Sequence, residues 1–332
     1  TIRRAATERD VALDHGYHIM PQSSGCVALT GASGFVGRHI LSRLLDAGYR
    51  VRALSRDPTR LHTSDERVAV VKGDLFDTTA LAELVKGTDA VIHLVGIIMQ
   101  VRRNGQTFQR VHVAGTKNLI MAARDAHVAR WVHMSALGSR PNAVSTYHRT
   151  KWQAEQAVRQ SGLTYTIFRP SIIHGPDGEF MQMVKHFACK RLLGVLPWMP
   201  YFGAGFLGTK GAGRLQPVWV QDVARCFVAA LSNSKTENQT YPIGGPDAYG
   251  WPQIYTSCKQ RLPNAKTKNR PKAVPVWYAK IIAGKPGVPF NRDQVIMSQE
   301  DSVCQTAKVQ MDLQVELASF DETFASYADQ VR

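Results

Sequence analysis

Apolar and polar positions follow two alternating patterns along the first two-thirds of the chain. Short, mostly apolar runs are each followed by a segment in which apolar residues return every three or four positions. The first pattern is typical of buried strands and the second of amphipathic helices. Strands are expected at 26–32, 49–57, 68–77, 89–98, 129–139 and 164–175, and helices at 37–48, 79–88, 111–126 and 146–162. This alternation predicts a doubly wound, mostly parallel α/β sheet with helices on both faces.

The pattern breaks up after His174, where loops rich in glycine, proline and aromatic residues replace it. We therefore expect the sheet domain to span 20–175, and a smaller α/β lobe, partly interleaved with the sheet, to span 176–332. Residues 1–19 are polar and lack the apolar centre of a secretion signal. They are interpreted as an extension outside the fold, either disordered or the product of an incorrect start site.

Composition restricts the class of protein. No apolar run among the 332 residues is long enough to cross a bilayer. The five cysteines show no C-x-x-C spacing, which fits a reducing compartment and gives no sign of a structural metal. The expected location is therefore the cytoplasm, with peripheral attachment to a membrane as the alternative.

Positive charge is concentrated in one part of the chain. The formal net charge is +15, and no acidic residue lies between Asp247 and Asp293, where nine Lys or Arg occur. A solvated basic surface, an anionic membrane surface, nucleic acid and an acidic protein are all open as explanations. No nucleic-acid motif accompanies the charge, and Trp277 and Tyr278 lie among the cations. We therefore predict weak, salt-sensitive binding of residues 259–292 to anionic lipid or an acidic partner, and no specific binding of nucleic acid.

A glycine-rich stretch follows the first predicted strand. VALTGASGFVGRHIL places Gly31, Gly34 and Gly37 between that strand and the first predicted helix. Gly31 permits the tight turn, Gly34 lets the backbone approach a pyrophosphate, and Gly37 permits close packing of strand on helix. The helix N-terminus supplies amide donors and a partial positive charge for the phosphates. This combination predicts that the chain binds a dinucleotide.

The end of the second strand bears on which dinucleotide binds. NAD sites commonly place an acidic residue there, whereas this chain has Ser55 and Arg56, with Asp57 one position later. Arg38, just after the third glycine, can approach the same corner. Guanidinium groups beside the ribose favour a 2′-phosphate. NADP(H) is therefore predicted over NAD(H), although Asp57 leaves NAD(H) open.

Tyr147 and Lys151 lie four positions apart near the start of a predicted helix. This spacing puts both side chains on one helix face. A phenol is a poor base at neutral pH unless a nearby cation stabilises the phenolate, so a lysine one turn away is a suitable partner. Two unrelated surface residues would show the same spacing, so the pair by itself does not establish a site.

Taken in order, these motifs resemble the short-chain dehydrogenase/reductase superfamily, in its extended or atypical branch. The resemblance covers about residues 25–235 and implies a Rossmann sheet. It rests on T-G-x-x-G-x-x-G at 30–37, Gly73-Asp74, Gly96, Ser135, Tyr147-x-x-x-Lys151 and Arg169-Pro170 before HGP. Within the superfamily the chain resembles the NAD(P)-binding accessory subunit of respiratory complex I and its bacterial relatives, through FRPSIIHGPDGEFM, LQPVWVQDVARCF and RDQVIMSQED.

The resemblance implies roles for particular residues. Ser135 would hydrogen-bond a substrate oxygen, Tyr147 would transfer the proton, and Lys151 would bind the nicotinamide ribose and lower the pKa of the tyrosine. Asp74 would accept a hydrogen bond from the adenine amino group. The implied cofactor-binding residues are Gly31, Ser33, Gly34, Phe35, Val36, Arg38, Arg56, Asp74, Leu75, Leu94, Gly96, Tyr147, Lys151, Pro170 and Ile173.

Two departures from the family pattern narrow the range of reactions that the chain is expected to catalyse. His112 occupies a position where the family often has Asn, and Ser135 lacks the second serine common in sugar epimerases, with Ser139 as a rival for its role. Both make a sugar-nucleotide epimerase a weaker interpretation. The predicted function is an NADP(H)-binding oxidoreductase or epimerase-like enzyme acting on an unidentified carbonyl or alcohol. The alternatives are a non-catalytic, cofactor-stabilised subunit or assembly factor of a respiratory complex or quinone pathway, and a dinucleotide-binding redox sensor.

Overall fold

A sheet of seven strands forms the centre of the protein, as the computed structural model shows for residues 25–61, 63–190, 195–208, 211–285, 288 and 290–331. The expectation for residues 1–19 lies outside these described residues. Neighbouring strands all pair in parallel, in the order β10-β6-β5-β4-β1-β2-β3. The strands are β1 (Cys26–Thr30), β2 (Arg50–Ser55), β3 (Val68–Lys72), β4 (Ala90–His93), β5 (Arg130–Met134), β6 (Thr164–Pro170) and β10 (Gln239–Ile243). The predicted doubly wound α/β class is confirmed.

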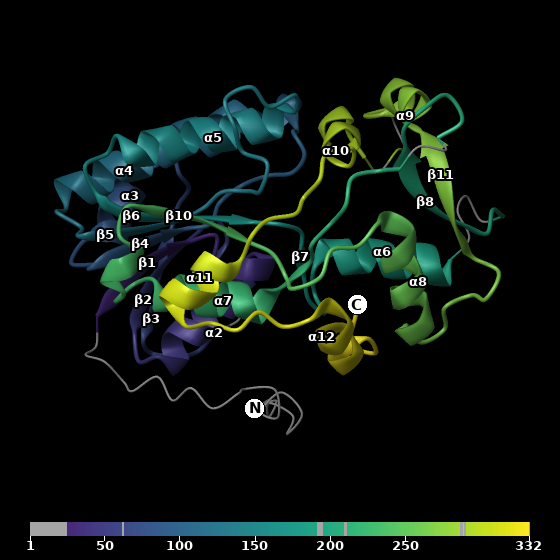
Figure 1. Ribbon diagram of the computed structural model, residues 1–332. Helices are drawn as coiled ribbons and strands as arrows, with labels where there is room; N and C mark the ends of the chain where they lie inside the picture. The colour runs from purple at the N-terminus through teal and green to yellow at the C-terminus, as the bar shows by residue number, and fades with distance from the viewer. Residues whose placement is uncertain are drawn as a thin grey trace.

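Helices cover both faces of this sheet (Figure 1). One face carries α3 (Thr78–Val85), α4 (Gly115–Asp125) and α5 (Thr146–Arg159), and the other carries α2 (Phe35–Asp46), α7 (Val220–Ala229) and α11 (Ala307–Leu313). Successive strand residues enter opposite cores: Val27 and Leu29 lie in the cluster beside α2, and Ala28 lies in the cluster beside α3 and α4. Because both faces are buried, these strands appear in the sequence as nearly continuous apolar runs.

The strand predicted at 164–175 is shorter in the structure. β6 ends at Pro170, and the chain turns before β7 (Ile173–His174), which pairs with β9 (Val218–Trp219) in a separate small sheet. The N–H of Ser171 donates to the carbonyl of the last β10 residue at 2.7 Å and so fixes the turn. Since that partner lies far along the chain, the local apolar pattern could not show where the strand ends.

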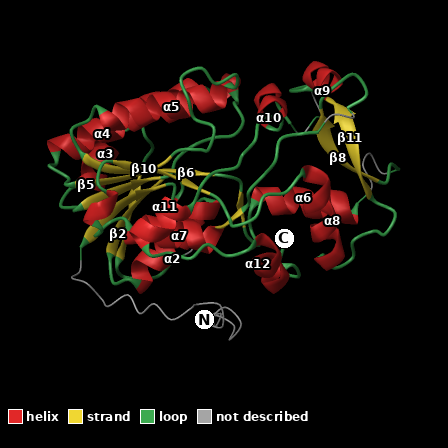
Figure 2. Ribbon diagram, in the orientation of Figure 1, coloured by secondary structure: helices red, strands yellow, loops and turns green. Residues whose placement is uncertain are grey.

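A smaller lobe lies beside the sheet (Figure 2). It has its own apolar core. Its strand β8 pairs in parallel with β11. The chain returns from this lobe to the sheet through α7, β10 and α11. None of the helices in the described part of the chain is long and apolar enough to span a membrane. The elements of the lobe are α6 (Glu179–Cys189), β8 (Trp198–Gly203), α8 (Trp251–Arg261), β11 (Arg270–Pro275), α9 (Val276–Ile282), α10 (Arg292–Met297) and α12 (Phe320–Tyr327).

Candidate functional site

The glycine-rich loop joins β1 to α2 at the carboxyl edge of the sheet. β1 lies between β2 and β4, where the order of the strands reverses, and ligands of such sheets bind beyond the carboxyl ends of the strands at that point. Gly31 has a φ of +81°, which favours glycine, and the Gly34 N–H donates to the Gly31 carbonyl at 3.0 Å to close the turn. A β-carbon on Gly37 would lie 2.0 Å from that same carbonyl oxygen, so the close packing of α2 requires glycine there.

The N-terminus of α2 is open toward this loop. Its N-cap residue, Gly34, makes no side-chain capping hydrogen bond, and no acidic residue lies in the first turn. The amides of Phe35 and Val36 therefore lie where phosphate oxygens can accept from them, with Ser33 just before the cap. The Phe35 ring packs against the loop after β7, where a β-carbon on Gly178 would approach the ring to 2.9 Å. The residues present thus fit the pyrophosphate of a dinucleotide.

The corner at the end of β2 holds two candidate guanidinium groups. Arg56 directly follows the strand and is exposed, and the carboxylate of the adjacent Asp57 is hydrogen-bonded within its own turn. Arg38 instead pairs with Asp177 at 2.5 Å, and His39 Nε2 lies 3.2 Å from the same carboxylate. Burial opposes ionisation of Asp177, but hydrogen bonds and charge from His39 and Arg38 lower its pKa to about 2. Arg56 is therefore exposed and has no carboxylate partner among the described residues, whereas the Arg38 side chain, although 40% exposed, is paired with Asp177.

The other residues implied for the cofactor come from neighbouring strand ends. Asp74 follows β3 and is exposed, and its Oδ1 accepts from the N–H of Phe76 at 2.7 Å. Gly96 follows β4 and is also exposed. The remaining implied cofactor-binding residues are buried or half-buried, and they are Leu75, Leu94, Pro170 and Ile173.

Lys151 is a buried cation at this edge of the sheet. It is 4% exposed, and its Nζ donates to the carbonyl of Met134, the last residue of β5, at 3.0 Å. A β-carbon on Gly96 would lie 3.0 Å from the same Nζ, so the ammonium faces bare backbone after β4. Burial lowers the pKa of Lys151 to about 8, with the charge of Glu155 acting in the opposite direction.

Tyr147 lies one turn before Lys151 on α5, which Ser145 caps by accepting from the His148 N–H. The phenol ring is half-buried between aromatic rings, with centroid distances of 5.8 Å to Phe108 and 5.4 Å to both His112 and His148. Burial raises the pKa of Tyr147 to about 12. The lowering of this pKa that Lys151 was expected to cause is therefore not observed in the protein alone.

His112 links the loop after β4 to the helix that carries Tyr147. It lies on a π-helical segment, Gln109–Ala114, that leads into α4. Its Nδ1 is 2.9 Å from the Thr150 hydroxyl and its Nε2 is 3.1 Å from the Ile97 nitrogen. Nε2 also lies 3.1 Å from the Ile97 carbonyl oxygen, so the tautomer decides whether this nitrogen accepts from the Ile97 N–H or donates to the Ile97 carbonyl. Burial, with the charge of Lys151, lowers the pKa of His112 and keeps it neutral.

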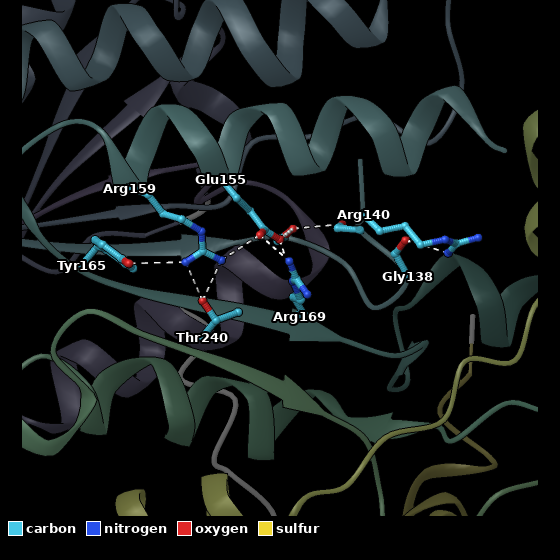
Figure 3. A network of polar contacts seen from close by, with 9 residues as sticks. Gly138, Arg140, Glu155, Arg159, Tyr165, Arg169 and Thr240 are labelled. Atoms are coloured by element: carbon cyan, nitrogen blue, oxygen red, sulfur yellow. Dashed lines mark hydrogen bonds and ion pairs between the residues drawn. The ribbon is translucent and has the colours of Figure 1, made fainter. Parts of the chain in front are cut away.

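Ser135 lies after β5, with its hydroxyl already engaged. The Ser135 Oγ donates to Glu155 Oε1 at 2.5 Å and lies 3.1 Å from the Ser139 Oγ. Glu155 is fully buried and also accepts from Arg159 and Arg169 (Figure 3). A hydroxyl carries a single proton, so Ser135 cannot donate to a substrate while it keeps this hydrogen bond.

The Glu155 cluster ties α5 to the sheet beneath it. Arg169 comes from β6, and Arg159 reaches on to Tyr165 and to Thr240 of β10 (Figure 3). The sequence identified Arg169 within a motif but missed Glu155. The only local pattern that involves Glu155 is its spacing from Arg159, and that spacing is typical of an ion pair on a helix surface.

The loop, the strand order and the buried lysine together define a Rossmann-type dinucleotide-binding protein. Comparison with known proteins agrees: residues 31–186 match a family described as NAD(P)H-binding. The ceramide reductase of Caulobacter vibrioides is 39% identical to this chain over 232 residues, which cover 69% of this chain and 68% of that protein. The chain therefore belongs to the extended or atypical branch of the short-chain dehydrogenase/reductase superfamily.

Two further similarities extend this comparison. NADH dehydrogenase (ubiquinone) 1 alpha subcomplex subunit 9, a mitochondrial protein of Arabidopsis thaliana, is 28% identical over 297 residues, covering 82% of this chain and 69% of that protein. The structure of UDP-glucose 4-epimerase from Thermotoga maritima superposes with a TM-score of 0.68 at 17% identity, covering 91% of this chain and 97% of that chain. The second similarity concerns the fold alone.

Proposed function

We propose that this chain is an NADPH-dependent reductase that acts on a carbonyl compound, with oxidation of the corresponding alcohol as the reverse reaction. The observation that carries the proposal is the buried ammonium of Lys151 beside the bare backbone of Gly96, one helical turn from Tyr147. The 39% identity to a ceramide reductase supports it. When bound, NADPH supplies the hydride that reduces the carbonyl carbon.

The protein side chains supply the proton that the carbonyl oxygen accepts. A tyrosine with a pKa of about 12 is protonated at neutral pH, which is the form needed to donate a proton to the carbonyl oxygen during reduction. Lys151 is proposed to hold the nicotinamide ribose and to stabilise the phenolate that Tyr147 becomes. Ser135 is proposed to hydrogen-bond the substrate oxygen once its hydroxyl leaves Glu155, with Ser139 as the rival for this role.

NADPH is proposed over NADH because of the corner at β2. Arg56 is exposed there, whereas Arg38 is held by Asp177. A 2′-phosphate on the ribose would therefore meet Arg56 as its charge-assisted partner.

Turnover and binding measured side by side test the proposal. Tyr147→Phe should abolish turnover on a panel of carbonyl compounds and alcohols, which should include long-chain lipids because of the ceramide reductase. NADPH affinity should stay within about twofold, since the ring still packs and only the hydroxyl is lost. Lys151→Met should lower both turnover and NADPH affinity. The matched control is Tyr201→Phe, in the small lobe. Full turnover by Tyr147→Phe would show that the proton donor is another residue.

A second candidate function is a cofactor-stabilised subunit of a larger assembly. It is favoured by the engaged hydroxyl of Ser135 and by the similarity to a subunit of NADH dehydrogenase. In that case NADPH raises the melting temperature of the protein, but neither wild type nor Tyr147→Phe turns over any member of the panel.

The basic segment 259–292 contains none of the residues proposed for catalysis or for cofactor binding. We infer that it meets an anionic partner, either a membrane surface or an acidic protein, which would make the protein peripheral at a membrane in the first case. The exposed side chains of the small lobe allow a choice between these two.

A further inference from the structure

The small lobe exposes a cluster of large apolar side chains, here called the lobe edge. Phe206 and Leu207 lie in the loop after β8 and are 79% and 71% exposed. Trp277, Tyr278 and Ile281 lie on α9 and are 47%, 47% and 58% exposed. An exposed apolar patch of this kind is typical of a surface that binds a membrane or another protein.

The side chains of the lobe edge are held in place by contacts within the lobe. Trp277 Nε1 donates to the Phe206 carbonyl at 2.9 Å, and the two rings stack with their centroids 5.9 Å apart and their planes at 14°. The loop closes tightly, since a β-carbon on Gly203 would lie 2.0 Å from the Gly208 carbonyl oxygen. α9 is anchored through Ala279, which is fully buried. The apolar side chains are therefore held outward by contacts beneath them.

The small lobe that carries the lobe edge also carries exposed cations, one of which, Lys280, lies on α9 itself. Lys259 and Arg261 are used within the lobe, the first on backbone carbonyls and the second on Asp321 at 3.1 Å. The other cations of the basic segment are exposed and form no ion pair with any residue that the structure describes. Lys280 lies on α9, Lys285 lies just after it, and Arg292 lies at the start of α10, which packs on α9. Lys266, Lys268 and Arg270 lie at the other end of β11, and the Lys272 ammonium lies 5.7 Å from the centroid of the Trp198 ring.

We propose that the lobe edge docks on the surface of an anionic lipid bilayer. Trp and Tyr favour the headgroup region, Phe, Leu and Ile favour the acyl boundary, and each lysine or arginine near the surface strengthens binding to anionic lipid about fivefold. The proposal does not depend on the reaction proposed above.

Charge and side-chain type argue against the other occupants. A second copy of the chain would bring one set of unpaired cations against another, which is repulsive. Nucleic acid would use the cations, but it would leave the aliphatic side chains of Leu207 and Ile281 without a partner. An acidic protein remains as the competitor, and the experiment separates it from lipid because the vesicles contain no protein.

Co-sedimentation of the full chain with lipid vesicles tests the proposal. Wild type should bind vesicles of phosphatidylcholine mixed with phosphatidylglycerol at low salt, bind phosphatidylcholine alone much less, and dissociate as salt is raised. Changing Lys280 and Lys285 together to Ser should weaken binding to the anionic vesicles at least about tenfold. Changing Phe206 and Leu207 together to Ser should weaken it at least about tenfold and leave the salt dependence in place.

Matched controls separate this effect from damage to the fold. Met121 and Met311 are exposed elsewhere, at 63% and 71%, and Lys86 and Lys117 are exposed cations on the sheet domain. Their replacement by Ser should leave vesicle binding unchanged, and every variant should keep wild-type NADPH affinity and melting temperature. If NADPH does not bind at all, vesicle binding still reports on the lobe edge alone.

Several results would overturn the proposal. Wild type that does not sediment with anionic vesicles at low salt lacks the docking surface. Equal binding to neutral vesicles removes the role of the cations, and binding that survives both sets of changes places the contact elsewhere. A dimer that forms with rising protein concentration and is lost on changing Phe206 and Leu207 would assign the lobe edge to a second copy instead.

Discussion

The cations packed against the sheet and those on the small lobe are arranged in opposite ways. At the sheet, Lys151 is buried on a backbone carbonyl, and Arg159 and Arg169 converge on one buried carboxylate. On the lobe, cations such as Lys268 and Lys280 face water without an ion-pair partner among the described residues. Buried charges act through fixed geometry and are hard to remove, whereas exposed ones act through a summed field that salt screens.

The largest effect should come from breaking the buried carboxylate cluster. Glu155→Ala leaves two guanidinium groups and a serine hydroxyl without their shared acceptor, so the free energy of unfolding should fall by about 3–5 kcal/mol. Urea unfolding followed by circular dichroism measures this loss. The matched control is Glu300→Gln, because the Arg140–Glu300 pair has an arginine side chain that is 44% exposed and should contribute less than about 1 kcal/mol. Equal losses in the two variants would contradict the contrast between buried and exposed charges.

The pKa of Lys151 predicts two opposite pH dependences. Its pKa is about 8 in the folded protein and about 10.4 in an unfolded chain, so between these values the unfolded state binds the extra proton. The stability of the cofactor-free protein should therefore rise with pH over this window by up to about 3 kcal/mol relative to Lys151→Met. That contribution is lost as the pH falls from about 10.4 to about 8.

Affinity for NADPH should change in the other direction. The anionic dinucleotide favours the charged lysine, so its affinity should fall above pH 8, by at most about tenfold per pH unit. Lys151→Met should show neither dependence, whereas the exposed control Lys117→Met should behave like wild type. If the wild-type and Lys151→Met profiles run parallel from pH 7 to 10, the lysine is not the buried cation that the structure shows.

Local patterns in the sequence predicted the features that depend on local physics. β1 to β5 and their helices followed from apolar spacing because β1, β2, β4 and β5 are buried on both faces and the edge strand β3 keeps an apolar run. The Gly31–Gly37 loop was predicted because a left-handed φ and a packing contact too close for a β-carbon each require glycine. The four-residue spacing of Tyr147 and Lys151 was likewise sufficient to place both on one helix.

Contacts between distant segments were not predictable in this way. Arg38 meets Asp177 and Phe206 stacks on Trp277 only after the chain has folded, and no spacing in the sequence records either pairing. Ser135 was assigned to substrate by resemblance, while its hydroxyl bonds to Glu155, twenty residues later. His112 was noted as a departure from the family, but its position between Ile97 and Thr150 depends on the π-helical segment that carries it.

Calorimetric titration with NADPH and NADH tests the central claim most directly, because it asks whether the carboxyl edge of the sheet binds a dinucleotide and which one. Wild type should bind NADPH at least about tenfold more tightly than NADH, since losing a charge-assisted phosphate contact costs about 1.5–3 kcal/mol. Arg56→Ala should lose this preference while keeping its affinity for NADH. Arg50→Ala, at the opposite end of the same strand, should retain it. Equal wild-type affinities, or a preference unchanged by Arg56→Ala, would contradict the assignment of Arg56, and binding of neither dinucleotide would contradict the account as a whole.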